Sequence, residues 1–201
     1  MKVLAFDFDG VLADTEEMIR DILHDLDIWP GKEAFLRHHD GNVWEEPQIA
    51  FDEKKVSSYI SLYLKEIENC KTFFYKSDLE SLATTYKLYI VSSNSEEAIG
   101  RFLKKYGLHD FFSEILGMHF HKSKVYKLGY ILNKESISPG ELMMLGDTLG
   151  DIKEALNANA RAAFAAWGFH GKERLQKHFE KEYLEQISFF ESKDEFMSSL
   201  I

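Results

Sequence analysis

Short apolar runs alternate with helical segments through most of this chain. The helical segments carry apolar residues three or four positions apart, whereas the short runs are mostly apolar. Continuous apolar runs of this kind are typical of strands that are buried on both faces. Because strands that alternate with helices form a parallel sheet covered on both faces, the sequence predicts an α/β fold with a doubly wound parallel sheet. We expect its strands at residues 2–6, 87–91, 111–116, 141–145 and 160–166.

A long helical stretch separates the first predicted strand from the second. Met18, Ile22 and Leu26 follow a helical spacing, and the clearest helix covers residues 53–70. The whole stretch, residues 16–74, is too long for an ordinary connection between two strands. Because long inserts at strand ends are often lids over a binding site, we expect a helical lid here.

The composition excludes several classes of function. The chain has 201 residues, of which 45% are hydrophobic, and a formal net charge of -10 at pH 7. Such an acidic balance argues against nucleic-acid binding, which depends on cationic contacts to phosphates. No apolar run approaches the ~18 residues of a membrane helix, and the first residues lack the features of a secretory signal. Because Cys70 is the only cysteine, we expect a cytoplasmic protein that binds neither nucleic acid nor membrane.

Polar side chains gather where the predicted strands end. Asp7 and Asp9 follow the first strand, residues 92–95 follow the second, and Asp147 and Asp151 follow the fourth. In doubly wound sheets, ligands bind outside the carboxyl ends of the strands. Two carboxylates that converge in a buried place repel each other unless a cation lies between them, and Mg2+ suits carboxylate ligands. For the first pair alone, a solvated strand end remains an alternative.

The order of these clusters resembles that of a known family. It runs D-x-D-G-x-x-x-D-T, a serine at a strand end, a lysine before a helix, and G-D-T-x-x-D. This order is similar to the haloacid dehalogenase-like (HAD) hydrolase superfamily, and in particular to its phosphoglycolate phosphatase-like branch. The resemblance covers nearly the whole chain. It implies a Rossmann-like core of residues 1–15 and 75–201, with residues 16–74 as a small helical cap.

The resemblance assigns roles to the acidic residues. It implies that Asp7 is the nucleophile, which forms an aspartyl-phosphate intermediate. Asp9 would be the general acid and then the general base. An aspartate at this position points to phosphoryl transfer rather than dehalogenation. A Mg2+ site would be formed by Asp7, Asp147, Asp151 and the backbone carbonyl of Asp9.

A phosphate-binding set follows from the same resemblance. Ser92 would donate a hydrogen bond to a phosphate oxygen, and the backbone N–H groups of Ser93 and Asn94 would support it near a helix start. The alternative for Ser92 is a helix cap, but Ser95 fills that role better. Gly10 would let the backbone approach the phosphate closely.

One lysine should balance the negative charge of this site. The candidates are Lys122 and Lys124, which both precede the next predicted helix. The proline that usually follows the lysine of this family is absent. We expect Lys122 to be the catalytic lysine, because its distance to Leu128 matches the family better.

Two adjacent histidines, His38 and His39, lie in the insert together with Trp44. A histidine pair can indicate a zinc site, but adjacent side chains point in different directions and no third ligand stands nearby. We therefore expect solvated residues or residues at the edge of the substrate.

These features together imply a Mg2+-dependent phosphatase that hydrolyses a small organic phosphomonoester. Phosphoglycolate is the first substrate to try, with sugar phosphates and nucleotides behind it. One alternative is a phosphosugar mutase resembling β-phosphoglucomutase, which returns the phosphoryl group to a sugar. A second alternative is a binding module without catalysis. The expected partner is a small phosphorylated metabolite, and the expected assembly is a monomer or homodimer.

Overall fold

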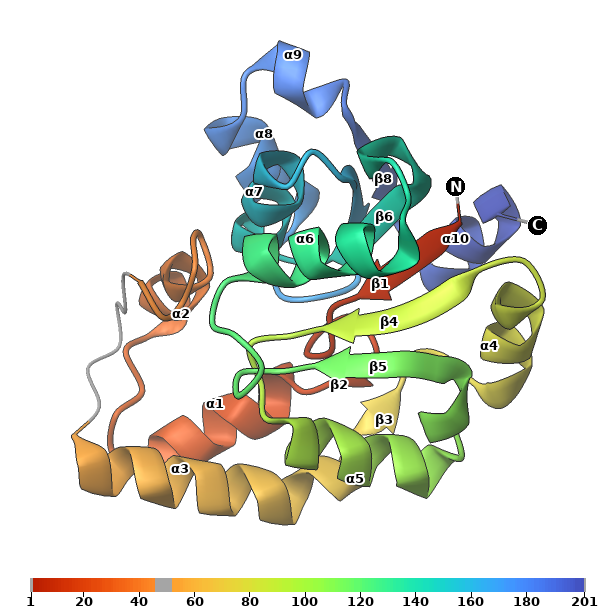
Figure 1. Cartoon of the computed structure of the whole chain (residues 1–201). Helices are drawn as coiled ribbons and strands as arrows, with labels where there is room; N and C mark the ends of the chain where they lie inside the picture. The colour runs from red at the N-terminus through yellow and green to blue at the C-terminus, as the bar shows by residue number, and fades with distance from the viewer. Residues whose placement is uncertain (1, 46–51, 201) are drawn as a thin grey trace.

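The computed structural model describes residues 2–45 and 52–200 (Figure 1). Its core is a six-stranded sheet in which neighbouring strands run parallel. In order across the sheet, the strands are β5 (Phe112–Leu116), β4 (Lys87–Val91), β1 (Val3–Phe6), β6 (Leu142–Gly146), β7 (Arg161–Ala165) and β8 (Ile187–Phe190). The five predicted strands are confirmed, and β8 adds an edge strand to them.

Helices cover both faces of this sheet. Leu4 and Phe6 of β1 join one apolar cluster, while Val3 and Ala5 join the other, because alternate side chains of a strand point to opposite faces. The first cluster includes residues of α4 (Lys76–Ala83), α5 (Glu96–Tyr106) and α10 (Lys193–Leu200). The second includes residues of α6 (Lys124–Glu135), α7 (Leu149–Asn157) and α8 (Lys172–His178), and the short helix α9 (Lys181–Leu184) follows. The doubly wound α/β fold is therefore confirmed.

Local sequence explains where the helices begin and end, as α5 illustrates. Ser95 Oγ accepts a hydrogen bond from the backbone N–H of Ala98, and Glu96 and Glu97 occupy the positive end of the helix dipole. The helix ends at Gly107, which adopts the left-handed conformation at a φ of 66°. Like α5, the other helices of the described chain are too short or too polar to cross a membrane.

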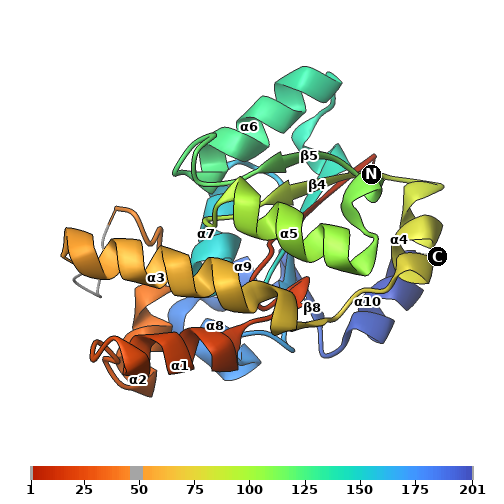
Figure 2. The ribbon, with the colours of Figure 1, turned by 90° about the horizontal axis from the view of Figure 1, so that it is seen from below.

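Between β1 and β4 the chain forms a helical insert. It contains α1 (Glu16–Asp25), α2 (Lys32–His38) and α3 (Glu53–Glu66), which continues into a 3-10 turn (Ile67–Asn69). Helices α1 and α3 lie side by side (Figure 2). The chain enters the insert through β2 (Ala13–Asp14) and leaves it through β3 (Lys71–Thr72), and these short strands pair antiparallel. The pairing holds the two ends of the insert together, while the division into separate domains stays a prediction.

The site predicted from the sequence lies where the strand order reverses. β1 has β4 on one side and β6 on the other, and the chain continues outward from each of them in opposite directions. In doubly wound sheets such a reversal opens a crevice outside the carboxyl ends of the strands. Figure 1 shows the helices of the insert beside this edge of the sheet.

Candidate active site

Three carboxylates meet at the carboxyl ends of β1 and β6. Asp7 follows β1, Asp147 follows β6, and Asp151 lies in the first turn of α7. Phe6 pairs with Leu145 in parallel register, so the residues after both strands leave the sheet at the same edge. One oxygen from each carboxylate lies within 4.8 Å of the others, and all three side chains are buried. The structure thus brings together the aspartates predicted as metal ligands.

Hydrogen bonds orient this cluster and leave one of its oxygens without a partner. The backbone N–H and the hydroxyl of Thr148 donate to Asp151 Oδ2 at 3.1 and 2.7 Å. Asp147 Oδ2 accepts a 2.6 Å hydrogen bond from the backbone N–H of Phe169, whereas its buried Oδ1 has no partner within the described chain. Because a buried oxygen without a partner is costly and Mg2+ binds carboxylate oxygens, these residues fit a divalent cation.

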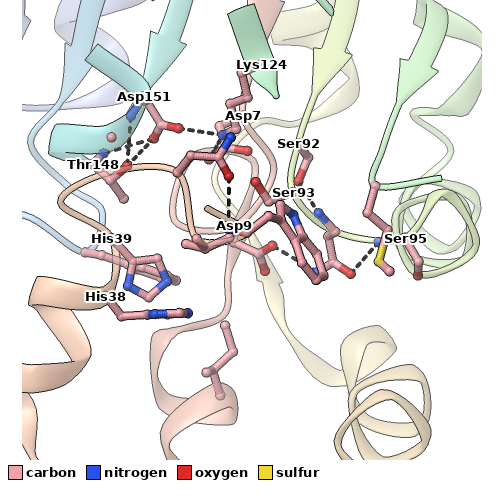
Figure 3. A pocket seen from close by; sticks show the side chains of 18 of the residues that line it. Asp7, Asp9, His38, His39, Ser92, Ser93, Ser95, Lys124, Thr148 and Asp151 are labelled. Atoms are coloured by element: carbon pink, nitrogen blue, oxygen red, sulfur yellow. Dashed lines mark hydrogen bonds and ion pairs between the residues drawn. The ribbon is translucent and has the colours of Figure 1, made fainter. Parts of the chain in front are cut away.

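Lys124 lies between two of the carboxylates. Its Nζ is 2.8 Å from Asp7 Oδ2 and 2.5 Å from Asp151 Oδ1, and its side chain is 4% exposed. Figure 3 shows the side chain pointing into the gap between these two aspartates. Burial alone would lower the pKa of Lys124, but Asp151 and Asp7 raise it above its ordinary value. The ammonium group therefore stays charged in a buried place.

Burial and Lys124 act in opposite directions on the carboxyl groups. Burial raises the pKa of Asp7 to about 7, although Lys124 opposes the shift. Burial, with the neighbouring Asp151, also raises the pKa of Asp147 well above its usual range. Burial acts on Asp151 too, but Lys124 and Thr148 hold the pKa of Asp151 below its ordinary value. The cluster is thus short of positive charge, which is what a divalent cation would supply.

The structure contradicts the expectation that Lys122 lies beside the acidic cluster. Lys122 is exposed, and its Nζ lies 5.1 Å from the centre of the Trp44 ring. Helix α6 begins at Lys124, and Ser123 caps it by accepting a hydrogen bond from the backbone N–H of Tyr126. The backbone changes direction at this cap. The side chain of Lys122 is therefore exposed to solvent, whereas that of Lys124 points into the site. Lys124 takes the position that the sequence analysis assigned to Lys122.

Asp9 forms contacts with the helical insert. Its Oδ1 accepts hydrogen bonds from the hydroxyl of Thr15, at 2.8 Å, and from the hydroxyl of Tyr63. Its Oδ2 accepts a 2.9 Å hydrogen bond from Asn94 Nδ2. Burial raises the pKa of Asp9, although these three donors oppose the shift. Tyr63 belongs to α3, and the sequence does not predict it as a site residue because helical spacing alone does not mark it as one. The proposed contact between the metal and the backbone carbonyl of Asp9 stays a prediction.

The loop after β4 carries the residues predicted to bind phosphate. Ser92 is buried, and its Oγ accepts a 3.1 Å hydrogen bond from the backbone N–H of Asn94. The sequence predicts that this N–H faces the phosphate, but in the structure it donates to Ser92 instead. Ser93 lines the cavity. Lys127 is fully buried on α6 and donates to the Ser92 carbonyl at 2.6 Å, which holds the loop against the core. Phosphate binding by this loop stays a prediction.

Sequence comparison identifies the family. Residues 4–165 match the family model described as haloacid dehalogenase-like hydrolase. The chain belongs to this family. The predicted family, and the prediction that this chain is an enzyme of the HAD hydrolase type, are therefore confirmed.

Relatives of this hydrolase carry phosphatase names. The chain is 26% identical over 199 residues to the pyrophosphatase PpaX of Bacillus velezensis, with 92% of each protein covered. It is 32% identical over 194 residues to a phosphoglycolate phosphatase of Synechococcus elongatus. This match covers 87% of this chain and 88% of the relative. A solved haloacid dehalogenase-like hydrolase from Streptococcus pneumoniae has a TM-score of 0.75 at 20% identity and covers 100% of this chain and 99% of its own. That structure supports the fold alone.

The two histidines of the insert lie beside this hydrolase site, but not as ligands of its acidic cluster. His38 and His39 line the cavity beside Asp9 (Figure 3). His39 Nδ1 lies 2.9 Å from the carbonyl oxygen of Phe35, and burial lowers the pKa of each histidine to about 4. Within residues 2–45 and 52–200, the group that could hold a metal ion is the aspartate cluster alone. The two imidazoles are therefore neutral groups at the edge of the cavity.

Gly10 is required for close packing in this site. Its φ is 73°, and an added Cβ would overlap the carboxylate of Asp147. We expect Gly10→Ala to lower the free energy of unfolding by about 2 kcal/mol or more, because both the backbone conformation and the space oppose a side chain. Urea unfolding followed by circular dichroism measures this change.

Gly100 provides the matched control for Gly10. It lies within α5, and an added Cβ there would meet no atom within 4 Å. We expect Gly100→Ala to raise the free energy of unfolding by about 0.5–1 kcal/mol, because alanine favours a helix over glycine. Equal effects of the two substitutions would contradict the close contact at Gly10.

Proposed function

We propose that this hydrolase is a Mg2+-dependent phosphatase that cleaves a small organic phosphomonoester through a phosphorylated Asp7. The observation that carries the proposal is the buried group formed by Asp7, Asp147, Asp151 and Lys124 at the carboxyl ends of two adjacent strands. A nucleophile, a cation and a set of metal ligands lie together there. The phosphatase names of the relatives support the same reaction class.

Asp7 is the proposed nucleophile that attacks phosphorus. One of its oxygens, Oδ2, contacts Lys124, and Oδ1 accepts a 2.7 Å hydrogen bond from the backbone N–H of Phe8. These contacts fix the direction of the carboxylate, which is the main requirement of a nucleophile in phosphoryl transfer. In the first step, a carboxylate oxygen bonds to phosphorus while the ester P–O bond breaks. The leaving alkoxide takes a proton from the carboxyl group of Asp9.

The second step returns Asp7 to its starting state. Asp9, now a carboxylate, accepts a proton from water, and the water oxygen bonds to the phosphorus of phospho-Asp7. The bond between phosphorus and Asp7 then breaks, and inorganic phosphate leaves. Thr15, Tyr63 and Asn94 hold Asp9 in place for both proton transfers.

A divalent cation fits this reaction scheme. Asp7, Asp147 and Asp151 would hold it, together with the backbone carbonyl of Asp9, and the unpaired Asp147 Oδ1 supports this set. When bound, Mg2+ would neutralise charge on the phosphoryl oxygens as the reaction proceeds. Lys124 would balance the remaining negative charge of the aspartates.

A panel of phosphorylated compounds tests this function. It contains phosphoglycolate, pyrophosphate, sugar phosphates, a nucleoside monophosphate and benzyl phosphates, each assayed for released inorganic phosphate with Mg2+ and with excess chelator. We expect release from at least one monoester with Mg2+, and a loss of about 100-fold or more after chelation, because the carboxylates would then repel the substrate. Full activity after exhaustive chelation would contradict the metal role. Isomerisation of a hexose 1-phosphate with a bisphosphate and without net release would favour a mutase.

A further inference from the structure

A single cavity connects the acidic cluster with the helical insert. It encloses about 540 Å³, within the range of cavities that hold small organic ligands. Asp7, Asp9, Ser92 and Lys124 line its polar end, and Figure 3 shows these side chains converging there. The opposite end is lined by α1, α3 and the loop that follows α2. A substrate whose phosphate lies at Asp7 would therefore place its leaving group against the insert.

The wall at the leaving-group end is apolar. It includes Ile19 and Leu23 of α1, Val56 and Ile60 of α3, and Trp44. Trp44, Val56 and Ile60 are 37%, 39% and 38% exposed, so apolar surface of the insert stays open toward this space. Exposed apolar surface inside a cavity indicates an apolar ligand rather than a requirement of the fold.

The cavity offers no cation for a second negative group on the substrate. Among the described residues that line it, Lys124 is the one lysine or arginine, and its ammonium group is already paired with Asp7 and Asp151. The lining also includes the acidic residue Glu154. Residues 46–51, which are outside the described chain, have the sequence EPQIAF and so add no basic side chain.

Lys122, which contacts a residue of the cavity wall, does not change this balance. Lys122 is exposed and is not part of the cavity lining, and its Nζ lies on the ring of Trp44. The two histidines of the lining are neutral at pH 7, since burial lowers the pKa of His38 and His39 to about 4. A carboxylate or second phosphate at this end would lose its hydration without gaining a partner of opposite charge.

We infer that the substrate is a phosphate monoester whose leaving group is neutral and carries an apolar or aromatic body. This inference rests on the proposed function, because it assumes that the phosphate lies at Asp7. The size of the cavity agrees, since about 540 Å³ lies within the range of cavities that hold larger organic ligands. The chemistry of the wall therefore ranks phosphoglycolate and pyrophosphate behind esters of apolar alcohols.

Two benzyl esters, one with a neutral and one with an anionic para substituent, test the inference. 4-Methylbenzyl phosphate and 4-carboxybenzyl phosphate have similar size and the same benzylic oxygen, so their chemical reactivity is closely matched. We expect kcat/KM with Mg2+ to be at least about tenfold higher for the methyl ester, because the carboxylate would be desolvated beside apolar groups. Equal or faster hydrolysis of the carboxy ester would overturn the inference and leave the phosphatase function standing.

A substitution in the wall sharpens the test. Ile60 is 38% exposed, so Ile60→Lys places a cation in the cavity without opening the core. We expect it to shift the ratio of kcat/KM toward the carboxy ester by about tenfold, whereas the neutral control Ile60→Gln should shift it much less. Lys122→Ala should leave the ratio unchanged in the otherwise native chain. If Lys122→Ala selectively removed hydrolysis of the carboxy ester, Lys122 would be the missing cation and the inference would fail.

Failure of the proposed function gives a different result. If no ester released phosphate, the phosphatase function would fail, and calorimetric titration of the same two esters would still decide the inference. Tighter binding of the methyl ester would support it, and equal or tighter binding of the carboxy ester would overturn it.

Discussion

Asp7→Asn should abolish phosphate release while leaving the fold intact. We expect kcat to fall by roughly 10⁴-fold or more, because an amide cannot form the acyl-phosphate intermediate. The amide has nearly the shape of the carboxylate, and Lys124 keeps its second partner, Asp151. Phosphate release under steady-state conditions measures the loss, and far-ultraviolet circular dichroism checks the fold.

Asp14 provides the matched control for this substitution. It is an exposed aspartate in β2, seven positions further along the chain and outside the cavity lining. Asp14→Asn should keep activity within about twofold and the free energy of unfolding within about 0.5 kcal/mol, as most surface substitutions do. Undiminished turnover by Asp7→Asn would show that another group attacks phosphorus.

Loss of Lys124 should have the second-largest effect. Its ammonium group is the cation that the structure places between Asp7 and Asp151. We expect Lys124→Met to lower kcat/KM by about 10²–10³-fold, the size of effect seen when one electrostatic contact to a developing charge is removed. We also expect a loss of about 3 kcal/mol in the free energy of unfolding, because two buried carboxylates would lose their partner.

Lys122 is the control for Lys124. It has the same side chain two residues earlier, is exposed, and contacts the Trp44 ring instead of the aspartates. Lys122→Ala should change kcat/KM for a neutral ester by less than about threefold. If Lys124→Met unfolds, Lys122→Ala still tests which of the two lysines belongs to the active site. A large loss of activity in the Lys122 variant would instead make Lys122 the lysine of the active site.

The fold and the acidic site could be predicted because they depend on local patterns. The central strands are nearly continuous apolar runs, and the parallel arrangement places the ends of neighbouring strands at one edge of the sheet. This rule alone brings Asp7 and Asp147 together, since one follows β1 and the other follows β6. The position of Asp151 could also be predicted, because it lies in the first turn of the next helix, which Thr148 caps.

The position of the lysine depends on a detail that patterns do not resolve. Lys122 and Lys124 differ by two positions, which is the usual uncertainty in where a helix begins. Ser123 is the N-cap of α6, so the chain changes direction between them. A motif distance counted from Leu128 cannot detect this change of direction, and it selected the exposed lysine.

Contacts between the insert and the core could not be predicted for another reason. Tyr63 and Asp9 are 54 positions apart in the chain, and their hydrogen bond depends on how α3 packs over the sheet. The pairing of β2 with β3 is equally long-range and involves two residues on each side. Periodicity identifies an apolar helix face, but it does not say which distant polar group that face will meet.

Trapping of the covalent intermediate tests directly whether Asp7 is the nucleophile. The protein would be mixed with a rapidly hydrolysed ester and Mg2+, quenched in acid within the first turnovers, digested, and mapped by mass spectrometry. We predict one added phosphoryl group on the peptide that contains Asp7, formed before inorganic phosphate appears and absent from Asp7→Asn. Release of phosphate without a phosphorylated Asp7, or with the phosphoryl group on another residue, would rule out Asp7 as the nucleophile.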